Sequence, residues 1–179
     1  MRSILFLDFD DVICLSAPYG GYDAKFALVS STERAEHQML WDSLFDEKAA
    51  KNLRCIHNEF NLCYVLSTSW WWLLNLQEIV QALRWGGLDF VADNLHEDWA
   101  TPKEERSRLR SKEISDWLAT HPEANPSWVI VDDTYSGPDL LTSKLDSAYV
   151  VMCRPAVGLQ EAEAQSLFHM LQRRREELR

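Results

Sequence analysis

Paired carboxylates follow two apolar runs of the chain. Asp8 and Asp10 end the first run, residues 3–7, and Asp132 and Asp133 end a later one. Side chains alternate along an extended chain, so Asp8 and Asp10 project to the same side. Two carboxylates in one small site are costly unless a cation neutralises them or one is protonated. Such a pair can supply a nucleophile and a proton carrier, which predicts catalysis or metal binding.

Acids at two separate strand ends suit a hard, oxygen-binding cation. Mg²⁺ is typically held by one or two carboxylates together with waters and phosphate oxygens. The candidate ligands are Asp8, Asp10, Asp132 and Asp133. Acids at strand ends can also simply face water, but two such pairs favour a site, and we expect magnesium as the cofactor.

Hydroxyl-bearing and basic residues complete the set that could bind a phosphate. Ser67 and Thr68 follow the second apolar run, where hydroxyls and loop amides can donate hydrogen bonds. Arg110, Lys112 and Lys103 precede or open a predicted helix. One of these cations could offset the negative charge of a nucleophile and its substrate; the residues alone leave open which one.

The elements that must position these residues alternate along the chain. Short apolar runs, typical of strands buried on both faces, lie at 3–7, 62–66, 88–92, 128–131 and 148–153. Helical patterns lie at 42–60, 71–85, 111–120 and 161–178. Strands that alternate with helices predict a doubly wound α/β fold with a mostly parallel, five-stranded, Rossmann-like sheet. Ligands of such sheets bind outside the carboxyl ends of the strands, where the acids lie.

Length and composition predict one globular domain. The chain has 179 residues, 46% of them hydrophobic, which suffices for one sizeable core. We expect a single domain over residues 1–179, in which 13–60 is either a small cap inserted between the first two strands or ordinary connecting structure.

Net charge, hydropathy and cysteine spacing argue against several kinds of partner and site. A net charge of −10 argues against bulk coating of nucleic acid. No stretch approaches the roughly 18 apolar residues of a membrane span, and the N-terminus does not resemble a signal peptide. Four cysteines without C-x-x-C spacing argue against a zinc site or a disulfide framework. We expect a cytoplasmic protein with no membrane partner.

The order of these segments resembles that of the haloacid dehalogenase-like (HAD) hydrolases. The first HAD motif, an apolar strand followed by D-x-D-x-[T/V], matches residues 4–12. The second, a strand that ends in Ser or Thr, matches 64–67, and the fourth, an apolar strand followed by DD, matches 128–133. The resemblance covers nearly the whole chain.

The resemblance implies roles for the matching residues. Asp8 would be the nucleophile that forms an aspartyl-phosphate and also a magnesium ligand, and Asp10 the acid/base. Ser67, or Thr68 if the strand ends one residue later, would bind the phosphoryl group. Asp132 would be a magnesium ligand, and Asp133 a ligand or its support.

One HAD subgroup, the HAD domain of Swiss Army Knife RNA repair proteins and their stand-alone relatives, is the most similar. Residues 110–118 read R-S-K-E-I-S-D-W-L and resemble its R-G-x-E-I-x-x-W-L stretch, which favours Arg110 as the catalytic cation over Lys112 and Lys103. Asp11 stands where many members have Gly, and Trp71 where the subgroup often has Arg.

The expected activity is a magnesium-dependent phosphohydrolase. The resemblance implies a nucleotide or a nucleic-acid end as substrate, and a small phosphorylated metabolite is the alternative. Asp11 and Trp70 are further candidates for substrate contact, alongside Ser67 and Thr68. The run Trp70 to Trp72 could form a base-stacking platform or pack against the insertion. A catalytically weak HAD-fold interaction module is the hypothesis from another functional class.

Overall fold

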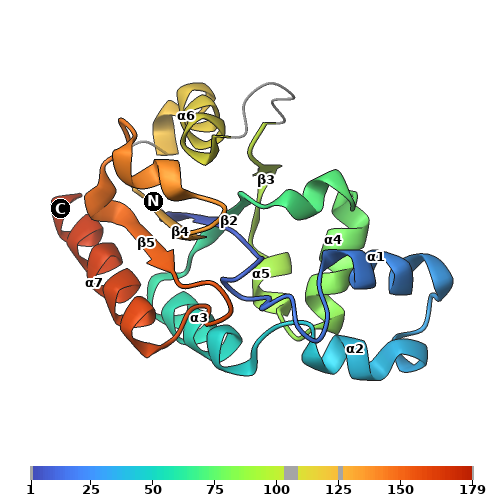
Figure 1. The fold of residues 1–179 in the computed structure, drawn as a ribbon. Coiled ribbons are helices and arrows are strands. Elements are labelled where there is room, and N and C mark those ends of the chain that lie inside the picture. The colour runs from blue at the N-terminus through green and yellow to red at the C-terminus, as the bar shows by residue number, and fades with distance from the viewer. Residues whose placement is uncertain (1, 103–108, 125–126, 179) are drawn as a thin grey trace.

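Five parallel strands form one sheet in the order β3-β2-β1-β4-β5 (Figure 1). The computed structural model describes residues 2–102, 109–124 and 127–178. The strands are β1 (Ile4–Leu7), β2 (Cys63–Leu66), β3 (Leu95–Ala100), β4 (Trp128–Asp133) and β5 (Val150–Cys153). The doubly wound α/β sheet predicted from the sequence is confirmed, and every strand pair in it is parallel.

The three central strands, β1, β2 and β4, are buried along their whole length. Strands covered on both faces are apolar throughout instead of alternating, which explains the continuous runs. Leu7 is level with Leu66 on one side and with Val131 on the other. The residues that follow, Asp8, Ser67 and Asp132, therefore lie at one edge of the sheet.

Helices cover both faces of the sheet. The α-helices are α1 (Gly21–Ser30), α2 (Gln38–Ser43), α3 (Glu47–Phe60), α4 (Leu76–Trp85), α5 (Asp89–Ala92), α6 (Arg110–Thr120) and α7 (Glu161–Glu177). The 3₁₀ helices are η1 (Arg34–His37), η2 (Ser69–Trp72), η3 (Pro122–Ala124), η4 (Pro138–Thr142) and η5 (Ser147–Tyr149). Within the described ranges, no helix has both the length and the apolar character needed to cross a membrane.

The two layers are visible in Figure 1, where α3 and α7 lie together on one side of the sheet and α6 on the other. Phe6 of β1 packs edge to face on Trp117 of α6, with ring centroids 5.3 Å apart. This contact joins the strand that carries Asp8 to the helix that carries Arg110. The core thus fixes the two elements from which the site is built.

The third strand was predicted wrongly. Residues 88–92, expected to be a strand, contain the short helix α5, in which Val91 is buried. The strand is Leu95–Ala100, of sequence LHEDWA, and none of its residues is fully buried. It has one neighbour, β2, and lies at the edge of the sheet. An edge strand that is open on one side tolerates polar residues, so the search for apolar runs missed it.

Two predicted helices are each interrupted. The helix expected at 71–85 begins only after Asn75, whose side chain accepts from the Glu78 N–H in a capping box, and the tryptophans before it form η2. The helix expected at 42–60 is divided into α2 and α3 by Asp46, which caps α3 by accepting from the Ala49 N–H. In both cases an Asn or Asp inside an apolar pattern ends one element and starts the next.

The segment between β1 and β2 has two parts. Helix α3 packs against α7 in the layer that covers the sheet. Helices α1 and α2 instead contact each other and α4, beside the sheet (Figure 1). Whether residues 13–60 act as a cap over the site stays a prediction.

The turn between β5 and α7 holds the loop that follows β1. Its Ala156 N–H donates to the Asp11 carboxylate at 2.7 Å, and the Leu159 N–H donates to the Val12 carbonyl at 2.8 Å. Gly158 allows this approach: its φ is 74°, and a Cβ there would lie 2.7 Å from the Val12 carbonyl oxygen. The turn therefore braces the segment that carries Asp8 and Asp10.

We expect Gly158→Ala to destabilise the protein more than Gly87→Ala. Gly87 has a similar φ of 82° but nothing within 4 Å of an added Cβ, so its variant reports backbone strain alone, about 1 kcal/mol. Gly158→Ala adds the clash with Val12, and we expect at least about twice that loss in the free energy of unfolding, measured by urea denaturation. Equal losses in the two variants would contradict the close approach.

Candidate active site

The carboxyl ends of β1, β2 and β4 bring the predicted residues to one place. The Asp8 N–H donates to the Val131 carbonyl at 3.1 Å, and the Ser67 N–H donates to the Leu7 carbonyl at 3.0 Å. Asp132 lies within β4 itself. Hydrogen bonds of the sheet thus fix the backbones of Asp8, Ser67 and Asp132 relative to one another.

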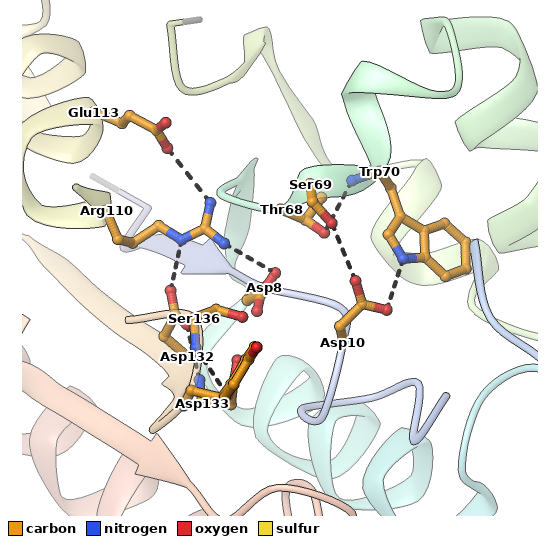
Figure 2. Close-up of polar contacts among 11 residues, drawn as sticks. Asp8, Asp10, Thr68, Ser69, Trp70, Arg110, Glu113, Asp132, Asp133 and Ser136 are labelled. Atoms are coloured by element: carbon orange, nitrogen blue, oxygen red, sulfur yellow. Dashed lines mark hydrogen bonds and ion pairs between the residues drawn. The ribbon is translucent and has the colours of Figure 1, made fainter. Parts of the chain in front are cut away.

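Three carboxylates converge at this edge (Figure 2). One oxygen each from Asp8, Asp132 and Asp133 lies within 4.8 Å of the others, and all three residues are at most 1% exposed. Within the described part of the chain, both oxygens of Asp8 and one oxygen each of Asp132 and Asp133 have no hydrogen-bond partner. The cluster therefore holds buried acceptors to which no described residue donates a hydrogen bond.

Arg110 is the cation that faces these acids. Its Nε lies 3.0 Å from Asp132 Oδ2 and its Nη2 lies 3.5 Å from Asp8 Oδ1. Glu113, one turn further along α6, lies 3.4 Å from Nη1 and orients the guanidinium from behind. Neither aspartate contact has the alignment of a hydrogen bond, so the attraction is electrostatic.

The electrostatics of the site oppose full ionisation. Burial, and then the charge of Asp132, raise the pKa of Asp8 well above its ordinary value, although Arg110 lowers it. Burial likewise raises the pKa of Asp132 to about 7, against the opposing effect of Arg110. One guanidinium is thus too little to balance the acids that surround it.

A divalent cation fits this cluster. The donor set is made only of carboxylate oxygens, which Mg²⁺ prefers, and several of these oxygens accept no hydrogen bond from any described residue. A cation among Asp8, Asp132 and Asp133 would satisfy the orphaned oxygens and oppose the rise in pKa that burial causes.

Asp133 is held by the loop that follows it. Its Oδ1 accepts from the N–H groups of Tyr135 and Ser136 at 2.6 and 3.1 Å, which leaves Oδ2 free to turn toward the cluster. Gly137 packs against Asp132, where an added Cβ would lie 2.8 Å from the carboxyl carbon. The turn thus closes tightly around the end of β4.

Asp10 lies apart from the three clustered carboxylates. Its Oδ1 accepts from Trp70 Nε1 at 2.9 Å and its Oδ2 accepts from the Ser69 hydroxyl at 3.1 Å (Figure 2). Trp70 is 1% exposed and packs between Phe9 and Phe45. Its ring is therefore no open stacking platform, and its polar edge faces Asp10.

The hydroxyls after β2 differ in their bonding. Ser67 is buried, and its hydroxyl has no partner among the described residues. The Thr68 hydroxyl accepts from the Trp70 N–H and caps η2. Ser67 thus offers an unsatisfied group beside Asp8, whereas Thr68 has a structural contact.

The remaining candidates lie as follows. Asp11, in the left-handed region with a φ of 56°, turns its carboxylate to the Ala156 N–H. Its backbone conformation is one that Gly adopts readily. Lys112 is exposed and pairs with Asp116 at 2.6 Å, while Lys103 lies outside the described residues. Among the described candidates, Arg110 is the cation that reaches the acids.

The search for strand-end acids missed two residues that shape the site. Glu113 is buried beside Arg110, and its i, i+3 spacing within the 110–118 motif was the available signal. Ser69 belongs to the hydroxyl cluster after β2, but nothing in its spacing indicated that it would bind Asp10.

Comparison with known proteins agrees with this geometry. The family model described as the HAD domain in Swiss Army Knife RNA repair proteins matches residues 4–164. No curated protein and no solved structure matches the chain. The matched range includes every strand of the sheet and each clustered carboxylate.

The raised pKa of Asp132 predicts how stability depends on pH without metal. Between its ordinary value of 3.8 and about 7 the folded protein binds more protons than the unfolded chain. The free energy of unfolding therefore falls as pH rises through this window, by on the order of 2–4 kcal/mol from this group. We expect thermal unfolding at pH 5 and pH 8 to show the fall in the wild type and a smaller one in Asp132→Asn.

Added Mg²⁺ should raise the melting temperature of the wild type most at pH 8, where the carboxylates are ionised, and should have little effect on Asp132→Asn. Asp89→Asn, a change at an exposed aspartate of α5, is the control and should respond as the wild type does. An equal response to Mg²⁺ in all three proteins would contradict a cation site at the cluster.

Proposed function

Because the chain belongs to the family of HAD domains found in Swiss Army Knife RNA repair proteins, we propose that it is a magnesium-dependent phosphohydrolase. The proposed substrate is the phosphate of a nucleotide or of a nucleic-acid end. The observation that carries the proposal is that neither carboxylate oxygen of Asp8 has a hydrogen-bond partner among the described residues, inside a carboxylate cluster that the Arg110 guanidinium approaches to 3.5 Å.

Asp8 is the proposed nucleophile. One of its carboxylate oxygens attacks phosphorus, and the bond from phosphorus to the ester oxygen breaks in line, which leaves an aspartyl-phosphate. Arg110 lies within 3.5 Å of Asp8 and stabilises charge on the transferring group, and the Ser67 hydroxyl donates to a phosphoryl oxygen. A magnesium ion held by Asp8, Asp132 and Asp133 would neutralise the carboxylates and the phosphate.

Asp10 is the proposed acid/base. Its proton passes to the leaving oxygen as the ester bond breaks, and its carboxylate then takes a proton from water. The resulting hydroxide attacks phosphorus, so the bond to Asp8 breaks and inorganic phosphate leaves. Unlike Asp8, Asp10 is partly exposed, and Ser69 and Trp70 hold it in place. Of these partners, the buried Trp70 is a positioning residue.

We expect Asp8→Asn to abolish magnesium-dependent phosphate release, because an amide cannot form the acyl phosphate. The panel should contain an aryl phosphate, a sugar phosphate, nucleoside monophosphates, and oligonucleotides with 5′ or 3′ phosphates. A loss of at least about 10³-fold is expected, and wild-type preference within the panel gives the substrate class. Release that survives in Asp8→Asn, or a wild type inactive on every member, would contradict the proposal.

We expect Trp70→Phe to slow hydrolysis of an alkyl phosphate roughly 10–100-fold, the loss of one hydrogen bond to a charged group. The change keeps an aromatic ring between Phe9 and Phe45 but removes the donor to Asp10. With a dinitrophenyl phosphate, whose leaving group needs no proton, the change should slow the first chemical step less. The rate of this step is measured from the burst of released dinitrophenol.

Trp41→Phe is the matched control for this prediction. Trp41 is as buried as Trp70, but its indole N–H has no partner among the described residues. The control should cost stability without changing the dependence on leaving group. If Trp70→Phe slows hydrolysis of the alkyl and the dinitrophenyl ester by the same factor, Trp70 contributes packing only and does not position Asp10.

A further inference from the structure

An aromatic pocket lies beside the site on the β3 side of the sheet. Its volume is about 570 Å³, and its walls include three indoles, those of Trp71, Trp99 and Trp117. Each comes from a different element, η2, β3 and α6 respectively. None of these indoles takes part in the proposed phosphoryl transfer.

The topology of the sheet places this pocket next to the phosphoryl site. The Thr101 N–H, in the pocket wall, donates to the Leu66 carbonyl at 3.0 Å. Ser67 follows Leu66, and Asp8 is one strand further along the same edge. Two strand spacings amount to roughly 10 Å, a separation comparable to the reach of a mononucleotide from its phosphate to the far edge of its base.

One wall of the pocket is rigid and flat. The rings of Trp117 and His121 are stacked, with centroids 3.8 Å apart and an interplanar angle of 12°. Both are bound to β3: Trp117 Nε1 donates to the Asp98 carbonyl, and His121 Nε2 lies 2.9 Å from the Asp98 carboxylate. Trp117 is 2% exposed and His121 covers its ring, so these two residues brace the wall from behind. The indoles that a ligand can reach are the half-buried ones of Trp71 and Trp99, and two indoles lining one pocket favour a planar ligand.

The pocket wall also contains an unsatisfied polar group. Thr101 is 1% exposed, and its hydroxyl has no partner among the described residues. A buried hydroxyl without a partner is unfavourable, and it can both donate and accept. The polar edge of a bound planar ligand would satisfy it.

We propose that this pocket binds the nucleobase attached to the phosphate that Asp8 attacks. The base would lie against the tryptophan-lined walls and present its polar edge to Thr101, while the phosphate reaches Ser67 and Arg110. This inference rests on the proposed function and assigns its substrate a planar base. A sugar phosphate without a base would leave the pocket empty.

The test compares adenosine 5′-monophosphate with ribose 5-phosphate, in which a hydroxyl at the anomeric carbon replaces the base. We expect wild type to prefer the nucleotide in kcat/KM, and Trp99→Ala to reduce that preference roughly 10-fold, mainly through KM for the nucleotide. Thr101→Val removes the unsatisfied hydroxyl at nearly constant volume, so it should fold, and it should also reduce the preference. Phe26→Ala, a change at an aromatic residue that is 70% exposed, is the control and should leave the preference intact.

Binding of adenosine, which has no phosphate, separates this proposal from the phosphatase. We expect adenosine to bind wild type in a calorimetric titration and to bind Trp99→Ala and Thr101→Val more weakly. If adenosine binds in this way but no phosphate ester is hydrolysed, the proposed function fails and the pocket stands. If esters are hydrolysed with no preference for the nucleotide and adenosine does not bind, the pocket proposal is overturned and the phosphatase stands.

Phosphorylated oligonucleotides show whether the bound base belongs to a free nucleotide or to the end of a nucleic-acid strand. Oligonucleotides with a 5′ or a 3′ phosphate also carry a base next to the scissile group. A higher kcat/KM for one of them than for the mononucleotide, reduced by Trp99→Ala, would assign the pocket to the terminal base of a strand. A higher value for the mononucleotide, reduced in the same way, would assign it to a free nucleotide.

Discussion

The repulsion among three buried carboxylates is the constraint on which this molecule depends. Asp8, Asp132 and Asp133 each place a carboxylate oxygen within 4.8 Å of the others at the ends of β1 and β4, where the side chains are buried from water. Burial and mutual charge raise the pKa of Asp8, and burial raises that of Asp132. A fold optimised for stability alone would place apolar side chains there, so the cluster is unfavourable unless a bound cation offsets the repulsion.

The elements around the cluster hold its carboxylates in place and offset part of their charge. Arg110 is the first residue of α6, and from this helix its guanidinium reaches Asp8 and Asp132 at the edge of the sheet. Glu113, also on α6, pairs with the guanidinium nitrogen that does not face these acids. The loop after β4 donates two N–H groups to Asp133 and approaches Asp132 so closely that only Gly fits at position 137. These contacts fix the acids in place but leave several of their buried oxygens without a hydrogen bond from any described residue, which is the preorganisation that a cation site needs.

The two acids of the first motif show why the sequence predicts which residues form the site but not every contact within it. Parallel register suffices to predict that Asp8 meets Asp132, because each comes directly after the apolar residues of a central strand, Leu7 and Val131, which are level with each other. The partners of Asp10 depend on η2, whose three tryptophans have no periodicity that predicts which one turns inward. The edge strand Leu95–Ala100 was missed for a related reason, since its packing on one side leaves no apolar run.

The 3₁₀ helix η2 divides the site into two halves with different physical demands. Trp70 points to Asp10 and is covered by α1, where Gly21 lies so close that an added Cβ would be 3.0 Å from the indole nitrogen. Trp71, the next residue, lines the pocket on the β3 side instead. Proton transfer requires a donor held within a few tenths of an ångström, which buried packing around Trp70 provides. Stacking tolerates small displacements because it depends on area more than on alignment. In the proposed reaction the more open side of η2 would therefore recognise the base, and the closed side would position the acid.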